Sequence, residues 1–216
     1  HAMAWKIKQS AHCTSLFIAP GNPGTAFCGE NIAIGVNDFP ALGAFCLEKN
    51  IQMLVVGPED PLVNGVYDYF KADPSLSTIT VVGPSAKAAL LEGSKAFAKA
   101  FMERNDIPTA GYREFTKENY SEGVAYLQSH SLPIVLKADG LAAGKGVVIA
   151  QTTEEALDSF EDMIQSSRFG TASERVVVEE FLTGVELSVF ALTDGKDFIL
   201  LPEAKDYKRI GEGDTG

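Results

Sequence analysis

A lysine that closes an apolar run, followed by a glycine-rich loop, is the part of this sequence best suited to chemistry. Lys137 follows the apolar residues 134–136, and Gly140, Gly144 and Gly146 lie in the loop after it. A lysine in a buried strand is costly unless an anion meets it. Glycines let backbone N–H groups approach a ligand closely, as in phosphate-binding loops. The stretch therefore predicts a phosphate-binding loop.

Two common phosphate-binding motifs do not fit this loop. A Walker loop would have glycine at position 139 and serine or threonine at position 146, but the sequence has Asp139 and Gly146. The glycine spacing also differs from the G-x-G-x-x-G of dinucleotide-binding loops. For the loop taken alone, a surface hairpin with glycines in its turns and lysines in water is the more expected interpretation. The elements around the loop must decide between these two interpretations.

The first part of the chain predicts an initial helix at residues 1–10, then strands and helices in alternation. The predicted strands cover residues 16–19, 31–36, 51–56 and 78–82, and the helices cover 39–50, 61–72 and 86–91. This alternation is typical of a parallel sheet with ligands beyond the carboxyl ends of its strands. Glycine- and proline-containing turns at residues 20–25, 57–59 and 83–85 either simply end strands or together form a substrate rim.

A helix at residues 94–104, ended by Asn105, Asp106 and Pro108, predicts a hinge into a second, smaller domain. A capping box at Thr152 and Glu155 predicts the start of a helix, and Asp194-Gly195 predicts a type I′ hairpin turn. The predicted strands cover residues 112–115, 134–136, 147–149, 175–178, 185–192 and 198–201, and the helices cover 120–130 and 153–166. Residues 179–182 are expected to follow a strand rather than to belong to it.

Composition limits the kind of partner. The chain has 216 residues and a formal net charge of −11, which argues against nucleic acid or an anionic membrane surface. Any site for a phosphorylated ligand must then be a local basic exception. Cys13, Cys28 and Cys46 suit neither a disulfide framework nor a zinc site, and we expect buried free thiols. No transmembrane segment or signal peptide is evident, so a cytoplasmic protein is expected.

Several segments together resemble the nucleotide site of ATP-grasp enzymes: Lys95, Lys137, the loop 140–146 and the segment 179–186. The closer resemblance is to the phosphoribosylamine–glycine ligases of purine biosynthesis, and it extends along the whole chain in order. The supporting motifs lie at residues 20–26, 56–63, 91–95, 107–109, 137–147, 206–209 and 214–216.

The resemblance implies an α/β fold, α+β overall, in which a parallel-sheet domain lacking its first strand precedes ATP-grasp domains. The implied boundaries are residues 1–91 for the substrate-side domain, 92–107 for a linker helix, 108–178 for the small domain and 179–216 for the start of the large domain.

The family pattern also implies which residues bind ATP. The residues assigned to ATP are Lys95, Lys137, Gly140, Gly144, Lys145, Gly146, Glu179, Glu180, Leu182 and Glu186. Lysines would neutralise the triphosphate, Glu179, Glu180 and Leu182 would contact adenine, and Glu186 would bind the ribose hydroxyls. Taken without the motif, Lys95 and the glutamates are equally explained as solvated side chains.

The implied reaction activates glycine's carboxylate with ATP and transfers the glycyl group to the amine of 5-phosphoribosylamine. The residues assigned to these substrates are Gly21, Asn22, Gly24, Thr25, Gly57, Pro58, Glu59, Pro61, Asp206, Lys208 and Arg209. The residues expected to act in catalysis are Lys137, Lys145, Asp206 and Arg209. Asp206 would pair with the ammonium of glycine, although on spacing alone a surface charge cluster is about equally expected.

This sequence departs from the family pattern at both ends. Of the family's initial Gly-Gly-Arg-Glu-His loop only His1 is present, and the carboxylate and amide that hold Mg²⁺ or Mn²⁺ are expected beyond residue 216. No metal ligand is therefore assigned within the chain. We expect a fragment that does not catalyse ligation by itself, and the sequence leaves open a monomer or a homodimer.

Three other functions are compatible with parts of the pattern. Another ATP-grasp ligase or a biotin-dependent carboxylase shares the nucleotide motifs, but the loops at residues 20–25 and 57–61 favour the glycine ligase. A nucleotide-binding module without chemistry also fits, since no metal ligand is assigned. A dinucleotide oxidoreductase is suggested by the parallel sheet, but the fingerprint loop is absent from these residues.

Overall fold

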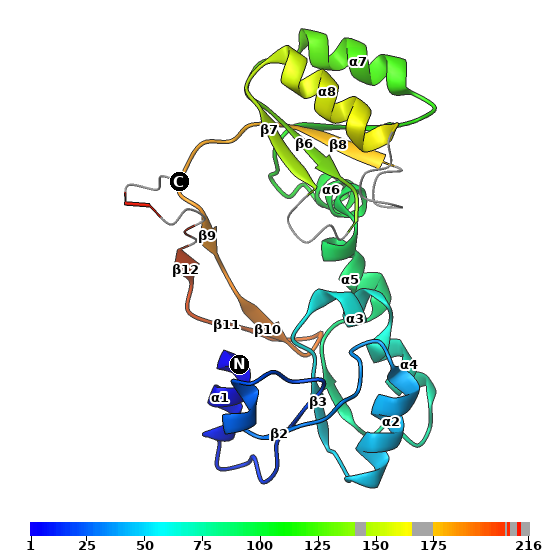
Figure 1. Ribbon diagram of the computed structural model, residues 1–216, viewed down its shortest axis with the longest axis vertical. Helices are drawn as coiled ribbons and strands as arrows, with labels where there is room; N and C mark the ends of the chain where they lie inside the picture. The colour runs from blue at the N-terminus through cyan, green and yellow to red at the C-terminus, as the bar shows by residue number, and fades with distance from the viewer. Residues whose placement is uncertain (141–145, 166–174, 206, 208–210, 213–216) are drawn as a thin grey trace. The chain divides into compact units, whose positions relative to one another are not determined.

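The computed structural model describes residues 1–140, 146–165, 175–205, 207 and 211–212. The chain divides into two compact units, His1–Glu180 and Phe181–Gly216 (Figure 1). The first unit contains two separate hydrophobic cores, one in its N-terminal part and one around a four-stranded sheet.

The N-terminal part alternates short strands with helices, as the sequence predicts. Its elements are α1 (Ala2–Lys8), β1 (Phe17–Ile18), the 3₁₀ helix η1 (Thr25–Phe27), β2 (Glu30–Asn31), α2 (Phe39–Glu48), β3 (Met53–Val55), α3 (Glu59–Val63), α4 (Val66–Ala72), β4 (Thr80–Val82) and α5 (Ala86–Gly93). Strands β1 and β2 pair in parallel, and so do β3 and β4. The predicted parallel pairing is therefore confirmed.

Apolar side chains from α2, α4 and the strand β4 form the core of this part. Phe70 is completely buried, and Val66 and Leu76 are almost completely buried beside it. The helix α2 begins where the sequence predicts, because the Asp38 carboxylate accepts a hydrogen bond from the N–H of Ala41 at 3.1 Å. Cys46 lies in this core as a free thiol, and burial raises its pKa.

Two predictions for this part are wrong in detail. The helix predicted at residues 61–72 is two helices, α3 and α4, because Gly65 between them has a left-handed φ of 91°. The strand predicted at residues 31–36 ends at Asn31. The chain turns there, since the N–H of Ile34 bonds the carbonyl of Ile32 at 2.7 Å instead of a neighbouring strand.

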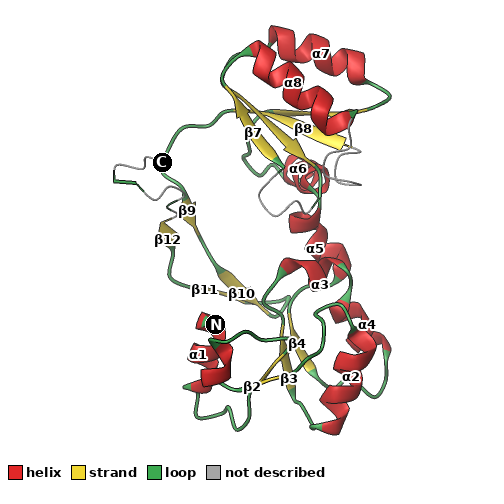
Figure 2. Cartoon of the chain, in the orientation of Figure 1, coloured by secondary structure: helices red, strands yellow, loops and turns green. Residues whose placement is uncertain are grey.

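The four-stranded sheet follows the helix α6 (Lys95–Arg104) and has the strand order β5-β8-β6-β7. Its elements are β5 (Tyr112–Thr116), α7 (Tyr120–Ser129), β6 (Ile134–Ala138), β7 (Val147–Ala150), α8 (Thr153–Ile164) and β8 (Arg175–Glu180). All neighbouring strands are antiparallel. Figure 2 shows α7 and α8 covering one face of this sheet.

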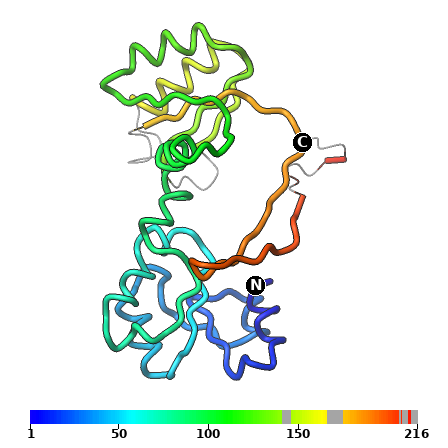
Figure 3. Tube along the Cα trace, turned by 180° about the vertical axis from the view of Figure 1, so that it is seen from behind, coloured from blue at the N-terminus to red at the C-terminus, as the bar shows by residue number. Residues whose placement is uncertain are grey.

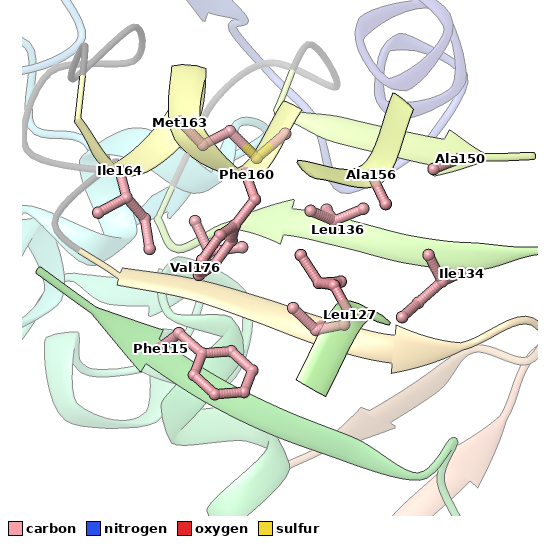
Figure 4. Packing of buried hydrophobic residues seen from close by; sticks show 11 residues of the cluster. Phe115, Leu127, Ile134, Leu136, Ala150, Ala156, Phe160, Met163, Ile164 and Val176 are labelled. Atoms are coloured by element: carbon pink, nitrogen blue, oxygen red, sulfur yellow. The ribbon is translucent and has the colours of Figure 1, made fainter. Parts of the chain in front are cut away.

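One face of the sheet supplies the hydrophobic core of this region. Leu136 from β6, Val176 from β8 and Phe115 from β5 pack with Phe160 of α8, and all four are completely buried (Figure 4). Side chains alternate between the two faces of a strand. The side chains of Lys137 and Glu179 are therefore directed to the face opposite α7 and α8.

Helix α8 begins at the predicted cap. The hydroxyl of Thr152 accepts a hydrogen bond from the N–H of Glu155 at 3.1 Å, and the Glu155 carboxylate accepts one from the N–H of Gln151 at 2.8 Å. Both bonds satisfy N–H groups near the first turn, although the second donor is Gln151 rather than the cap residue itself.

Strand β8 is longer than predicted and corrects the position of two candidate residues. It runs from Arg175 to Glu180, so Glu179 and Glu180 belong to the strand rather than following it. Glu179 is paired on both sides, since it lies opposite Tyr112 and Val135 in the register of the sheet, and Glu180 lies opposite Ile134 of β6. The apolar pattern alone ends at Val178, because it gives no sign that a carboxylate in this strand has buried cationic partners.

The second unit contains two short antiparallel strand pairs, and Figure 3 traces its chain in orange to red. Its strands are β9 (Leu187–Ser188), β10 (Ala191–Thr193), β11 (Phe198–Leu200) and β12 (Ala204–Lys205). The single strand predicted at residues 185–192 is wrong, because β9 pairs with β12 whereas β10 pairs with β11.

The type I′ turn predicted at Asp194-Gly195 is also wrong. Thr193 pairs with Phe198, so residues 194–197 form a longer loop, and only Gly195 of them has a positive φ, 91°. The Asp194 carboxylate accepts hydrogen bonds from the N–H groups of Lys196 and Asp197, each at 2.9 Å. These bonds stabilise the loop and hold the pKa of Asp194 below its usual value.

Candidate nucleotide-binding site

Lys137 and Glu179 form an ion pair on the sheet face opposite α7 and α8. Lys137 Nζ lies 2.8 Å from Glu179 Oε2, and the two side chains are 29% and 7% exposed. They come from the adjacent strands β6 and β8, in which Lys137 lies opposite Val177 and Glu179 opposite Val135. Because alternate residues share a face, this register places both side chains on one side of the sheet.

A second lysine binds the other oxygen of the same carboxylate. Lys99 Nζ of α6 lies 3.4 Å from Glu179 Oε1, and the Lys99 side chain is 6% exposed. The same ammonium donates to Thr109 Oγ1 at 2.9 Å and to the carbonyl oxygen of Ala110 at 3.0 Å. Figure 1 shows α6 on the side of the sheet away from α7 and α8. Among the described residues, Lys99 and Glu179 are the charged side chains classed as buried.

Asp139, directly after β6, joins the beginning of the glycine-rich loop to the N-terminus of α6. Its Oδ1 accepts hydrogen bonds from the N–H groups of Lys95 at 2.6 Å and Ala96 at 3.3 Å. Its Oδ2 accepts one from Ser94 Oγ at 3.1 Å. Lys95 Nζ returns a bond to the carbonyl oxygen of Gly140 at 2.9 Å. A carboxylate at this helix end is electrostatically favourable, and it fixes where Lys95 leaves the helix.

The two lysines of α6 are partly desolvated. Burial lowers the pKa of Lys95, while the nearby charge of Asp139 opposes that shift and Lys137 adds to it. Burial also lowers the pKa of Lys99, and the charge of Glu179 opposes that shift. Burial disfavours the charged form of an amine, so cations at this site gain from an anionic partner. Lys95, Lys99 and Lys137 lie here with the carboxylates of Asp139 and Glu179, so these five groups carry one net positive charge in an acidic chain.

The described part of the glycine-rich loop has the geometry of a hairpin whose base is closed. The N–H of Ala138 donates to the carbonyl of Gly146 at 2.8 Å, and Gly140 has a left-handed φ of 89°. A side chain is disfavoured at that φ, so the position suits glycine. The predicted site residues Gly144 and Lys145 lie outside the described residues.

The residues assigned to adenine and ribose occupy different surroundings. Glu180 is the last residue of β8, and its Oε1 accepts a hydrogen bond from the N–H of Gly111 at 2.9 Å. Leu182 is 63% exposed and Glu186 is exposed, both in the second unit. Their roles at the base and the sugar stay predictions.

Of the residues assigned to the other substrates, Asn22 and Thr25 bind each other within their loop. Asn22 Oδ1 accepts hydrogen bonds from the N–H groups of Gly24 and Thr25 at 2.9 and 3.0 Å. The buried hydroxyl of Thr25 donates to Asn31 Oδ1 at 2.7 Å. Gly21, with a φ of 79°, begins this loop, whose shape these bonds fix.

The structure brings the loop at residues 20–25 and the loop after β3 to the same end of α1. A Cβ placed on Gly24 would lie 2.6 Å from His1 Nδ1, and one on Gly57 would lie 3.7 Å from Met3 Sδ. Pro58 precedes α3, Glu59 is its first residue, and Pro61 is buried within it. That these two loops form a substrate rim stays a prediction. Asp206, Lys208 and Arg209 lie outside the described residues.

Sequence reasoning missed two residues at this site. The sequence patterns assign no role to Lys99, and they mark Asp139 only as a mismatch to the Walker pattern. The signal for Lys99 is weak, because Lys95 and Glu103 share its helix face with Ala96 and Met102. For Asp139 it was a carboxylate directly between a lysine strand and a glycine loop.

Comparisons with known proteins agree with the resemblance. The family model described as the phosphoribosylglycinamide synthetase ATP-grasp (A) domain matches residues 93–216, and the N-domain model of the same synthetase matches residues 1–92. Among the described residues, no helix is long and apolar enough to cross a membrane.

Curated relatives match the whole chain. The phosphoribosylamine–glycine ligase of Vibrio cholerae is 47% identical and that of Escherichia coli K12 is 48% identical, each over 218 aligned residues. The crystal structure of the Thermotoga maritima phosphoribosylamine–glycine ligase shares 32% identity and a TM-score of 0.76, and covers 100% of this chain and 50% of its own.

The chain covers 49% of each of the two curated relatives, so it spans about half their length. The two family models nevertheless match all of its residues. The ATP-grasp match alone includes the four-stranded sheet, α6 and the ion-paired residues Lys99, Lys137 and Glu179. The chain therefore belongs to the phosphoribosylglycinamide synthetase family.

Proposed function

We propose that this chain forms part of an enzyme that ligates glycine to 5-phosphoribosylamine with ATP, giving glycinamide ribonucleotide, ADP and phosphate. The family match over the whole chain supports this reaction class. The single structural observation that carries the proposal is the cluster of Lys95, Lys99 and Lys137 on one sheet face in a chain of net charge −11. Such a cluster suits the negative charge of a triphosphate.

The proposed chemistry has two steps. A carboxylate oxygen of glycine attacks the γ-phosphorus of ATP, the bond to the β-phosphate oxygen breaks, and glycyl phosphate and ADP result. The amine of phosphoribosylamine then attacks the glycyl carbonyl, phosphate leaves, and the nitrogen loses a proton as the amide forms. No protein nucleophile is required. Catalysis by this chain would consist of positioning and charge stabilisation.

Lys95 and Lys137 would bind phosphate oxygens from the sheet side, because their ammonium groups lie next to the beginning of the glycine-rich loop. From the loop, the ammonium of Lys145 and the backbone N–H groups of Gly144 and Gly146 would bind phosphate oxygens. Asp206 would hold the ammonium of glycine, while Lys208 and Arg209 would lie near the sugar phosphate. The segment that contains Glu179, Glu180 and Leu182 would contact adenine through its backbone, and Glu186 would bind the ribose hydroxyls. The loops at residues 21–25 and 57–61 would face phosphoribosylamine.

The carboxylates described at this site do not fit a divalent metal. Asp139 is bound to N–H groups and a hydroxyl, and Glu179 to two ammonium ions. Among the described residues, no group of three or more His, Cys, Asp or Glu side chains is arranged to hold a metal ion. We therefore derive no step through Mg²⁺ or Mn²⁺. That such an ion acts with ATP stays a prediction.

The predicted domains are proposed in the same way. Residues 1–91 would bind phosphoribosylamine, residues 92–107 would link to the small domain at 108–178, and residues 179–216 would begin the large domain. The boundary between the matched family models, at residue 93, supports the first division. A cytoplasmic location also stays a prediction.

The reaction is tested by measuring ADP release from the enzyme that contains this chain. Multiple-turnover ADP formation should require glycine and phosphoribosylamine together, because the second step must consume glycyl phosphate before the next turnover. Lys137→Met should lower its rate about 100-fold, since a phosphate partner of the transition state is lost. The control is Lys71→Met, which removes an ammonium bound to the carbonyls of Ser77 and Ile79 and should keep the rate. ADP release that needs neither substrate would contradict the proposal.

A further inference from the structure

Two lysine ammonium groups bind the single carboxylate of Glu179. Its Oε2 lies 2.8 Å from Lys137 Nζ and its Oε1 3.4 Å from Lys99 Nζ, so two ammonium ions share one carboxylate. Either lysine alone would neutralise it. The trio therefore carries one surplus positive charge on this sheet face.

The two lysines differ in their freedom to leave the carboxylate. The Lys99 side chain is 6% exposed, and its ammonium is also held by Thr109 Oγ1 and the carbonyl of Ala110. The ring of Tyr112 lies 5.3 Å from the same ammonium. The Lys137 side chain is 29% exposed, and the bond to Glu179 is the hydrogen bond described for its ammonium. Lys137 can thus turn to a ligand while Lys99 stays.

A phosphate that binds Lys137 must compete with Glu179. If Glu179 had no other cation, removing Lys137 would leave a buried, unpaired carboxylate, which is strongly unfavourable. Lys99 removes that obstacle, because Glu179 remains paired when Lys137 moves. Without a ligand, Glu179 holds the side chain of Lys137 in place. When a phosphate binds, Lys137 can leave Glu179, because Lys99 remains paired with that carboxylate.

We propose that Lys99 is a positioning residue of the nucleotide site, which neutralises Glu179 so that Lys137 can bind phosphate. The inference rests on the proposed function and deepens it. Lys99 itself need not touch the nucleotide. Its effect should therefore depend on the phosphate groups of the ligand and not on the nucleoside.

The test uses calorimetric titration, with ATP and with adenosine, of the enzyme that contains this chain. Lys99→Gln retains an amide that can donate to Thr109 and Ala110 but removes the charge. It should weaken ATP binding about tenfold, as expected for the loss of one close charge coupling, and leave adenosine binding unchanged. Lys99→Arg keeps the charge and should bind ATP with near wild-type affinity. Lys71→Met, which removes a carbonyl-bound ammonium elsewhere, should alter neither titration.

A double variant isolates the role of the carboxylate. In Lys99→Gln, Glu179 competes alone for Lys137, so the additional change Glu179→Gln should restore most of the lost ATP affinity relative to adenosine. Equal losses for ATP and adenosine in Lys99→Gln, with no rescue, would mean that Lys99 only supports the fold and would overturn the inference. Absence of ATP binding by the wild-type enzyme would instead contradict the proposed function.

A second measurement needs no nucleotide and so separates the two failures. The rate at which an acylating reagent modifies the Lys137 amine can be followed by mass spectrometry of peptides. In Lys99→Gln the unshared Glu179 should hold the Lys137 ammonium more tightly and slow its acylation severalfold, while Glu179→Gln should accelerate it. An unchanged rate in both variants would overturn the inference whatever the titrations show.

Discussion

Glu179 shows how one residue can link the packing of this chain to its proposed chemistry. Its carboxylate is almost completely buried in β8 and is stabilised by two lysines from different elements, α6 and β6. A buried ion pair adds little stability over an apolar pair, but the loss of one partner is costly. The residue is therefore expected to be sensitive to substitution both for stability and for ligand binding.

Replacing Glu179 should destabilise the fold. Glu179→Gln leaves Lys99 buried without its counter-ion, and we expect the free energy of unfolding to fall by about 3 kcal/mol. Glu114→Gln is the control, since Glu114 pairs with Arg175 at 2.8 Å where the side chains are 29% and 46% exposed. That change should cost less than about 1 kcal/mol. Urea unfolding of both variants measures these losses. Equal losses would show that breaking the buried Lys99–Glu179 pair costs no more than breaking the more exposed Glu114–Arg175 pair.

The lowered pKa of Lys99 predicts a pH dependence of stability. The folded-state pKa lies below the value of about 10.4 in an unfolded chain, so between the two the unfolded chain binds more protons. The free energy of unfolding should therefore rise with pH across that interval. Lys99→Gln removes this contribution.

The measurement is the difference in unfolding free energy between wild type and Lys99→Gln as pH is raised from about 8 to about 10. The unfolding free energy of wild type should increase relative to that of Lys99→Gln over this range. A shift in favour of the variant would mean that folding raises the pKa of Lys99, contrary to its burial.

At the scale of elements, the contact between α7 and α8 depends on a glycine. A Cβ on Gly123 of α7 would overlap the ring of Phe160 of α8, with Cε1 only 2.7 Å away, and would lie 3.1 Å from the ring of Phe115. Both rings are completely buried, so neither can move into solvent. The small residue therefore sets how closely α7 approaches the rest of the core.

Gly123→Ala should destabilise the sheet region even though alanine favours helices. Overlap in the core should cost about 1–3 kcal/mol, more than the ~1 kcal/mol gained from helix propensity. Gly35→Ala is the control, because a Cβ there meets nothing within 4 Å. Thermal unfolding of the two variants distinguishes them. A Gly123→Ala variant more stable than wild type would show that α7 can shift without loss.

The sequence predicted the helices and strands of the first unit well where local signals are strong. Asp38 and Thr152 cap helices as expected, and the apolar run before Lys137 is a buried strand. Predictions failed where the outcome depends on partners distant in the chain. Which strand β9 and β10 pair with, and how far β8 continues, is decided by tertiary pairing that no local pattern records.

The same limit applies to the candidate site. Lys137 could be identified because a lysine in an apolar strand is unusual, and Gly140 because its loop requires a left-handed φ. The pairing of Lys99 with Glu179 could not, since it requires the register of β6 and β8 and the placement of α6 on one face of the sheet. Residue types alone indicated which side chains could bind phosphate, whereas the tertiary fold determines which of these side chains pair with each other.

In the molecule as a whole, we propose that the sheet face carrying Lys137 and Glu179 binds nucleotide phosphates. The helix pair α7 and α8 covers the other face and completes the hydrophobic core (Figure 2). The acidic character of the chain makes this cluster of lysines a local exception. Membership of the phosphoribosylglycinamide synthetase family, whose ATP-grasp model matches this region, agrees with that assignment.

The most direct test is labelling with an ATP analogue whose terminal phosphate carries a reactive acyl group. Such a reagent acylates lysines that lie beside the bound phosphates, and mass spectrometry identifies them. We predict that the reagent acylates Lys95 or Lys137, with Lys145 as a further labelled position, and that excess ATP prevents this labelling. Labelling that ATP does not block, or that is confined to lysines of α4 and α5 such as Lys71 and Lys87, would contradict it.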